Sequence, residues 1–184
     1  VAEVASTCNE VLTINALRKK FAGNQAAQQA LIGRLLEGFR TTVFRQTMFA
    51  EFEQKAHEMA AAGESMTSQS LYNIYKKLNE DYFGPDTVID PEIQYEWERI
   101  PHFYTPFYVY QYATGFSAAI AISRKIFNGE PGILEGYKKF LSSGCSDTPI
   151  ELLKLAGVDL SHTGPVEEAL KFFEELLNEF EELA

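Results

Sequence analysis

Cysteine and basic residues are scarce in this 184-residue sequence. The two cysteines, Cys8 and Cys145, lie far apart and form no CxxC pair, so we expect reduced thiols and no disulfide framework. The N-terminus lacks the basic and apolar pattern of a secretory signal, and we therefore expect a cytoplasmic protein. No apolar run approaches the roughly 20 residues that a membrane-spanning helix needs, so no membrane partner is expected.

Positive charge is also limited. The chain has 16 Lys and Arg against 26 Asp and Glu, which gives a formal net charge of −10. This balance argues against a nucleic-acid partner, because phosphate contacts require clustered Lys and Arg. Seven of the glutamates lie between Pro165 and Ala184, so much of the acidity is expected on one solvated helix face.

A complete zinc-binding helix motif is missing as well. His57 and Glu58 begin like HExxH, but the fifth position is Ala61, so the second histidine ligand is absent. We therefore expect His57 to be an ordinary position on a helix.

Hydrophobic spacing of three and four residues dominates the chain and predicts a single all-α unit over residues 1–184. No convincing strand pattern and no repeat of fixed period is found. The expected helices cover 1–21, 25–62 with a break near 41–42, 68–81, a short segment after Pro91, 106–127, 133–141, 149–157, and 165 onward.

Two carboxylates lie on one face of the first expected helix. Glu3, Thr7 and Glu10 are spaced i, i+4, i+7, among many apolar residues. Because the helix is so apolar, we expect it to be buried on most sides, and a buried carboxylate needs a metal, a cation or hydrogen bonds. The alternative is that Glu3 is exposed at the helix end and that Glu10 pairs with a lysine.

Aromatic residues crowd the segment from Ile100 to Gly115. It holds one of the three histidines, His102, and four of the nine tyrosines. Tyr108 and Tyr112 are expected on the same helix face. Phenols and an imidazole brought together can donate hydrogen bonds to a developing oxyanion. The alternative is an aromatic helix packed in the core, with its hydroxyls bonded locally.

Four segments in this order carry a resemblance that covers essentially the whole chain. They are VAEVASTCNEVL at the start, TVFRQTMFAEFE (Thr42–Glu53), RIPHFYTPFYVYQYATG (Arg99–Gly115) and SGCSDTPIELLKLAGVD (Ser143–Asp159). Together they resemble the oligoendopeptidase F group of the thimet-oligopeptidase-like zinc metallopeptidases.

The resemblance implies a mechanism and a set of site residues. In such enzymes zinc is held by two histidines of an HExxH helix and by a glutamate on a following helix, which here looks like Glu3. Glu10 then matches an acidic position that orients a ligand histidine. His102, Tyr108 and Tyr112 match a segment that binds the peptide and stabilises the tetrahedral intermediate.

The missing HExxH motif is the main departure from that family. We expect it upstream, so this chain is expected to be the C-terminal part of a catalytic domain and to be inactive alone, because one carboxylate cannot make a catalytic zinc site. The expected partners are short unfolded peptides and the missing N-terminal part, and exposed apolar surface favours self-association. The alternative function is a non-catalytic helical interaction module.

Overall fold

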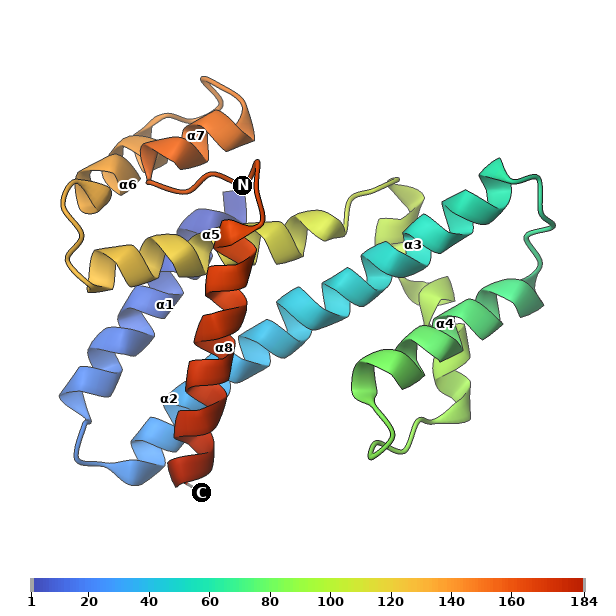
Figure 1. The fold of residues 1–184 in the computed structure, drawn as a ribbon, viewed down its shortest axis with the longest axis horizontal. Helices are drawn as coiled ribbons and strands as arrows, with labels where there is room; N and C mark the ends of the chain where they lie inside the picture. The colour runs from blue at the N-terminus through green and yellow to red at the C-terminus, as the bar shows by residue number, and fades with distance from the viewer. Residues whose placement is uncertain (1, 184) are drawn as a thin grey trace. The chain divides into compact units, whose positions relative to one another are not determined.

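The computed structural model describes residues 2–183, and their regular structure is entirely helical, which confirms the predicted all-α class (Figure 1). None of the helices within this range combines the length and the apolar character needed to cross a bilayer. The α-helices are α1 (Ala2–Lys20), α2 (Gln25–Gly38), α3 (Arg45–Ala61), α4 (Ser68–Phe83), α5 (Tyr110–Phe127), α6 (Ile133–Ser142), α7 (Pro149–Leu155) and α8 (Gly164–Leu183). A π-helical turn, η1 (Phe39–Phe44), and two 3-10 helices, η2 (Pro91–Arg99) and η3 (Pro101–Tyr104), complete the set.

The described residues form two compact units. Unit 1 draws on residues 1–43 and 114–184, and unit 2 consists of Phe44–Ala113. The chain passes from one to the other within η1 and within α5. The η1 turn lies where the sequence predicts a break near 41–42. The prediction of a single domain over residues 1–184 stays a prediction.

Unit 1 is built around the run Phe116–Ser123 of α5, in which every side chain is buried. Its small alanines let other helices approach closely. Val4 and Cys8 of α1 pack against one part of this run, and Val11 and Ile14 belong to the cluster around another part.

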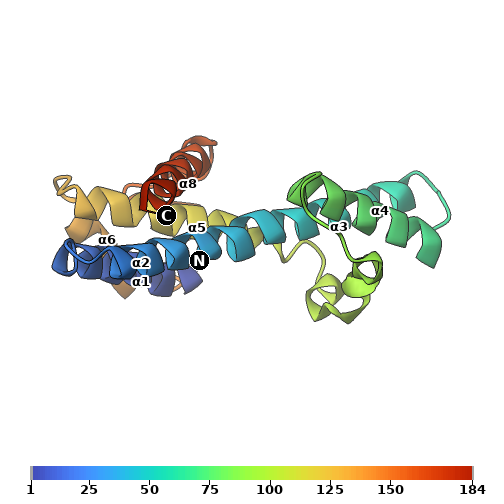
Figure 2. The same ribbon diagram turned by 90° about the horizontal axis from the view of Figure 1, so that it is seen from below.

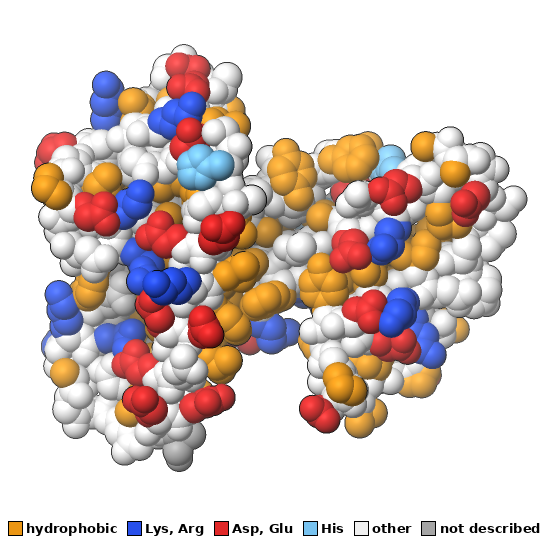
Figure 3. Space-filling view, in the orientation of Figure 1, with side chains coloured by type: hydrophobic (Ala, Val, Ile, Leu, Met, Phe, Trp, Pro, Cys, Tyr) orange, Lys and Arg blue, Asp and Glu red, His pale blue; other side chains and the backbone are white. Residues whose placement is uncertain are grey.

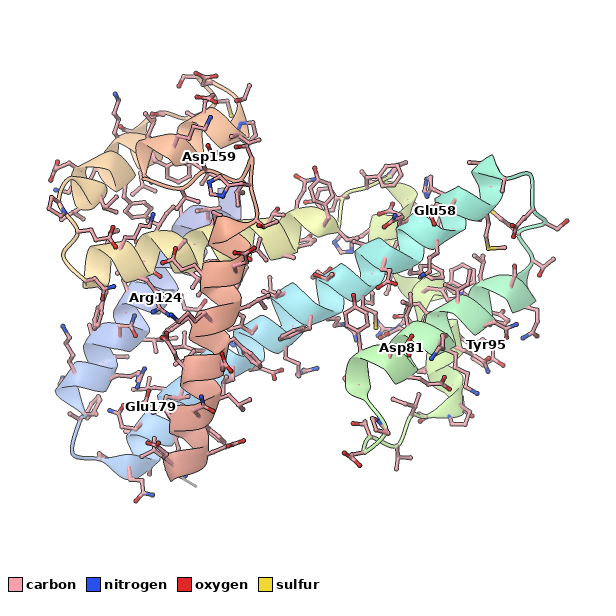
Figure 4. The ribbon with its side chains drawn as sticks, in the orientation of Figure 1. Glu58, Asp81, Tyr95, Arg124, Asp159 and Glu179 are labelled. Atoms are coloured by element: carbon pink, nitrogen blue, oxygen red, sulfur yellow. The ribbon has the colours of Figure 1, made fainter. Side chains whose placement is uncertain are left out.

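Helix α8 covers the second of these clusters. Its Ala169 and Leu176 are buried with Ile32 and Leu35 of α2, and Figure 2 shows α8 on one side of the layer that α1 and α2 form. Arg124, labelled in Figure 4, extends from α5 and pairs with a glutamate of α8 at 2.8 Å. Glu179 pairs with Arg18 of α1, and Glu167, Glu174, Glu181 and Glu182 are exposed, so most of the acidic residues of α8 face solvent as predicted. Acidic side chains are prominent on the face that Figure 3 shows.

Helices α6 and α7 hold the start of α1 in place. The hydroxyl of Tyr137 on α6 donates to the carbonyl oxygen of Ala5 at 3.1 Å. Burial raises the pKa of the neighbouring Cys8 thiol to about 11, so this thiol stays protonated at neutral pH. A Cβ atom at Gly136 would lie 2.0 Å from the carbonyl oxygen of Leu155, and only glycine therefore permits this approach of α6 to α7.

Unit 2 packs α3 and α4 against the 3-10 helices through aromatic side chains. Phe52 of α3 lies edge-on to Tyr75 of α4, with ring centroids 5.2 Å apart, and its ring is 5.8 Å from that of Trp97 on η2. Helix α4 begins at a capping box: the Thr67 side chain accepts the N–H of Ser70 and the Ser70 hydroxyl accepts the N–H of Thr67.

A nearly buried carboxylate, Glu96, ties η2 to both helices. It accepts hydrogen bonds from the Tyr75 hydroxyl at 2.7 Å and from Arg45 at 2.6 Å, and it also pairs with Arg99. Burial alone would raise the pKa of Glu96, but the hydrogen bonds from Tyr75 and Arg45, with the positive charges of Arg45 and Arg99, outweigh it and hold this pKa below its usual value.

Because its folded-state pKa is lowered, Glu96 is expected to contribute stability that is lost at acidic pH. A lowered folded-state pKa stabilises the fold above the unfolded pKa of about 4.3, and this stabilisation is lost as the pH falls through the folded value. We therefore expect Glu96→Gln to lower the thermal unfolding midpoint at pH 7, and the gap to wild type to narrow below about pH 4. Glu98→Gln, which changes an exposed neighbour, is the control; a gap independent of pH would contradict this assignment.

Candidate functional site

The two predicted carboxylates of α1 lie on an exposed face. Glu3, Ser6, Glu10 and Thr13 are all exposed, whereas Val4, Cys8 and Val11 on the opposite side are buried. The expectation that α1 is buried on most sides is therefore wrong for these carboxylates. The reason is that α1 packs with its apolar side alone, within the part of the chain that the structure describes.

Glu3 lies in the first turn of α1. Its Oε2 accepts a hydrogen bond of 3.0 Å from the Ser6 hydroxyl, which also lies 3.0 Å from the Glu3 carbonyl oxygen. This contact orients the carboxylate without burying it. An exposed, oriented carboxylate oxygen is a ligand type that zinc accepts.

Glu10 is paired with an arginine rather than the lysine considered from the sequence. Nε and Nη2 of Arg34, on α2, both donate to Oε1 of Glu10, at 3.0 and 2.7 Å. Both side chains are about half exposed. The geometry leaves Oε2 as the oxygen that can accept a further N–H.

His102, Tyr108 and Tyr112 come together in unit 2, and we call them the His/Tyr cluster. The Tyr112 hydroxyl and Nε2 of His102 are hydrogen bonded at 3.1 Å. The Tyr108 ring stacks on that of His102 with a centroid separation of 5.8 Å, and it lies edge-on to Tyr112 at 5.6 Å. His102 is exposed and Tyr108 is 40% exposed, whereas Tyr112 is half-buried and packs against the aromatic core of unit 2, so the cluster lies at the edge of that core.

The cluster has the functional groups to bind a peptide carbonyl. Two phenol hydroxyls and one imidazole offer hydrogen-bond donors at a surface that solvent and ligands can reach. Such donors stabilise a negative charge that develops on a carbonyl oxygen, provided that they are held in place before the reaction.

The backbone around Tyr108 differs from the prediction. The helix expected to start at Pro106 starts at Tyr110, and residues 105–109 form an irregular turn. Tyr108 and Tyr112 therefore do not share a helix face, and the rings meet because the turn folds Tyr108 back over the first turn of α5. The physical reason is the backbone of Phe107, which has a φ of 55° and cannot continue a right-handed helix.

Two residues that were not predicted as site residues, Glu53 and Phe107, shape this turn. Oε1 of Glu53, a buried residue of α3, accepts the backbone N–H of Phe107 at 2.7 Å. Glu53 follows Phe49 by four residues and precedes Ala56 by three, so helical spacing places it on the buried face of α3. The positive φ of Phe107 has no comparable signal in the sequence.

His57 lies on α3 and takes no part in a metal cluster of the described residues. Its Nδ1 is 2.9 Å from the carbonyl oxygen of Glu53, and its ring lies 4.5 Å from that of Phe107. Within residues 2–183, no group of three or more His, Cys, Asp or Glu side chains is arranged to hold a metal ion. The described residues can therefore supply single ligands but not a set.

A pocket of about 230 Å³ lies in unit 2 beside the same residues. Glu53 and His57 line it together with Phe103, which follows His102 in the chain. The remaining lining is Phe52, Ala56, Ala60, Met66, Leu71 and Trp97. This lining suits one apolar side chain.

Comparison with known proteins decides the family. Residues 1–172 match the family described as Peptidase family M3. The chain belongs to that family.

Relatives and solved structures agree with this assignment. Oligopeptidase PepF of Bacillus subtilis (strain 168) is 52% identical over 184 residues, and oligoendopeptidase F (chromosomal) of Lactococcus lactis subsp. cremoris is 46% identical over 183. Each match covers 100% of this chain, but only 27% and 30% of those two proteins.

Among solved structures, that of oligoendopeptidase-F from Enterococcus faecium matches with a TM-score of 0.94 and 47% identity. A putative peptidase from Chlamydophila abortus matches with a TM-score of 0.91 and 39% identity. The matches cover 99% and 100% of this chain, and 35% and 31% of those chains. The present chain thus spans about a third or less of the proteins that it resembles.

The exposed position of Glu10 predicts a small role in folding. We expect Glu10→Gln to change the free energy of unfolding by about 1 kcal/mol or less, because exposed ion pairs contribute about 0.2–1 kcal/mol. Arg34→Gln, which removes the other partner, should have an effect of the same size. Urea denaturation measures both; a loss of several kcal/mol in either variant would show that the pair has a structural role.

Proposed function

We propose that this chain is the helical C-terminal part of the catalytic domain of a zinc metalloendopeptidase that hydrolyses short oligopeptides. The observation that carries the proposal is the match of the whole chain, at 52% identity, to part of a protein named an oligopeptidase. The exposed His/Tyr cluster and the exposed Glu3 carboxylate support it, because they are the groups that this chemistry requires. The rest of the same polypeptide is then the first partner of this chain, and short peptides are the substrate.

Zinc would be held here by Glu3 together with ligands from outside this chain. A catalytic zinc site has three protein ligands and an open position for water. Glu3 fits one of the three, as an oriented and accessible carboxylate, and the two histidines would come from an upstream HExxH helix. When bound, zinc lowers the pKa of a coordinated water to about 7 and polarises the carbonyl that is attacked.

Glu10 would orient one of those histidines. Ligand histidines usually donate their second ring N–H to a carboxylate, which fixes the ring and its tautomer. Arg34 holds Glu10 by Oε1, so Oε2 is available for that bond. The arginine thus stabilises the negative charge of Glu10 without consuming both oxygens.

The His/Tyr cluster would bind the scissile peptide and stabilise its tetrahedral intermediate. The Tyr112 hydroxyl and Nε2 of His102 are bonded to each other, so one of their two protons is already used. The Tyr108 hydroxyl and the remaining proton of the Tyr112–His102 pair would donate hydrogen bonds to the peptide carbonyl as negative charge develops on its oxygen. Removal of one donor of this kind costs about 10²–10³ in kcat. The hydrogen bond between Tyr112 and His102 supports this role, because it restrains both side chains before a substrate arrives.

The chain alone should neither bind zinc tightly nor cleave peptides, since it supplies one ligand of three. A cytoplasmic location and self-association of the isolated chain stay predictions. The interaction-module alternative accounts for the amphipathic helices, but it leaves the oriented Glu3 carboxylate and the His/Tyr cluster without a use.

Zinc-dependent hydrolysis of a short quenched fluorescent peptide tests the proposal. We expect no activity from this chain alone, activity when it is combined with the upstream segment that carries HExxH, and removal of that activity by chelation. Glu3→Gln should abolish it because a ligand is lost, whereas Glu64→Gln, at an exposed position of the α3–α4 connection, should leave it unchanged.

Activity of the chain alone would contradict the proposed division of the zinc site. Full activity of the Glu3→Gln variant would contradict the ligand role of Glu3. Lack of activity in a combination that is correctly folded and zinc-loaded would favour the interaction module instead.

A further inference from the structure

A buried carboxylate, Glu53, lies next to the turn that carries Tyr108. The residue is 5% exposed and sits on the buried face of α3. Removing a carboxylate from water is costly unless hydrogen bonds replace the lost hydration. Here Oε1 accepts the Phe107 N–H at 2.7 Å.

Phe107 adopts a conformation that needs such support. Within residues 2–183 it is the one non-glycine residue with positive φ, at 55°. For a residue with a Cβ atom this region is strained, and it persists where surrounding contacts hold it. The N–H bond to Glu53 and the His57 ring, 4.5 Å from the Phe107 ring, are contacts of that kind.

The turn at Phe107 sets the position of Tyr108. Reversal of the chain at Phe107 brings the Tyr108 ring over His102, with an angle of 21° between the two ring planes. A Phe107 residue with negative φ would send the next residue in another direction and separate the two rings. The position of the cluster therefore depends on a backbone state that Glu53 stabilises from another helix, 54 residues away in sequence.

We infer that Glu53, supported by His57, is a positioning residue for the peptide-binding His/Tyr cluster. Its carboxylate holds the Phe107 N–H, which fixes the turn and places Tyr108 against His102. The inference rests on the proposed function for its catalytic consequence, but its geometric part concerns this chain alone. It also explains why a carboxylate is retained on the apolar face of α3.

The first experiment measures the cluster in this chain by nuclear magnetic resonance. The chain has three histidines, so each ring can be assigned, and His162 in unit 1 serves as an internal reference. We expect nuclear Overhauser contacts between the His102 and Tyr108 rings in wild type. Glu53→Met, which keeps the size but removes the acceptor, should lose these contacts and shift the His57 and His102 signals while His162 stays unchanged.

Two matched variants accompany it. Glu53→Gln keeps an acceptor oxygen and should retain the ring contacts. Glu58→Gln removes a carboxylate from the same helix, at the position labelled in Figure 4, and should leave the contacts between the His102 and Tyr108 rings unchanged. Phe107→Gly gives a further check, because glycine adopts a positive φ without a Cβ penalty: the double variant Glu53→Met/Phe107→Gly should keep ring contacts that Glu53→Met loses.

The second experiment measures kinetics in the complete, zinc-loaded enzyme. Glu53→Met should lower kcat by about 100-fold, because small misplacement of catalytic groups has effects of that size. KM should change much less, zinc content should stay the same, and Glu53→Gln should restore most of the rate. If Glu53 had a purely structural role, Glu53→Met would lower the thermal unfolding midpoint but would not lower kcat much more than it changes KM.

Ring contacts that persist in Glu53→Met would overturn the inference. Contacts that are lost without any fall in kcat would also overturn it, because the residue would then position nothing that the reaction uses. An inactive wild-type enzyme would count against the proposed function, and the ring contacts in this chain would still decide whether Glu53 positions the cluster.

Discussion

The burial of the run Phe116–Ser123 of α5 is the constraint on which unit 1 depends. Because Phe116–Ser123 must be covered, α1, α2, α6, α7 and α8 contribute apolar faces to the clusters that surround it. This packing leaves the opposite face of α1 exposed, and that face carries Glu3 and Glu10. The carboxylates are therefore accessible as a consequence of how the core is filled. The Tyr137 bond to the Ala5 carbonyl then fixes the first turns of α1, in which Glu3 lies.

Unit 2 differs from unit 1 because it holds three polar aromatic side chains, His102, Tyr108 and Tyr112, near a surface. Two largely buried carboxylates, Glu96 and Glu53, accept hydrogen bonds within this unit. Glu96 ties η2 to α3 and α4 through Arg45 and Tyr75, and Glu53 holds the turn at Phe107. Preorganised donors are effective because they need no reorientation during the reaction. Glu96 contributes to the packing of η2 on α3 and α4, whereas the buried Glu53 is the carboxylate that we infer to position the His/Tyr cluster through the Phe107 N–H.

Much of this structure follows from local patterns. Apolar spacing predicts the helices, and the i, i+7 spacing of Glu3 and Glu10 places them on one face. The sequence also draws His102, Tyr108 and Tyr112 into one segment. The route by which Tyr108 reaches His102 does not follow from that segment, because Phe107 has a positive φ and its N–H bonds to a side chain on α3. The sequence leaves open whether the α1 carboxylates are buried or exposed, because composition indicates how apolar a helix is but not how many of its sides are covered. In the structure both are exposed, as the alternative for Glu3 has it.

The central claim is that Glu3 supplies one ligand to a zinc ion whose other ligands lie outside this chain. The most direct test is anomalous diffraction at the zinc absorption edge from crystals of the longer polypeptide grown with zinc. We predict one strong peak at about 2.0–2.2 Å from a Glu3 carboxylate oxygen, with two histidines of an HExxH helix completing the set. A zinc peak coordinated without Glu3, in crystals where α1 is well ordered, would contradict the account.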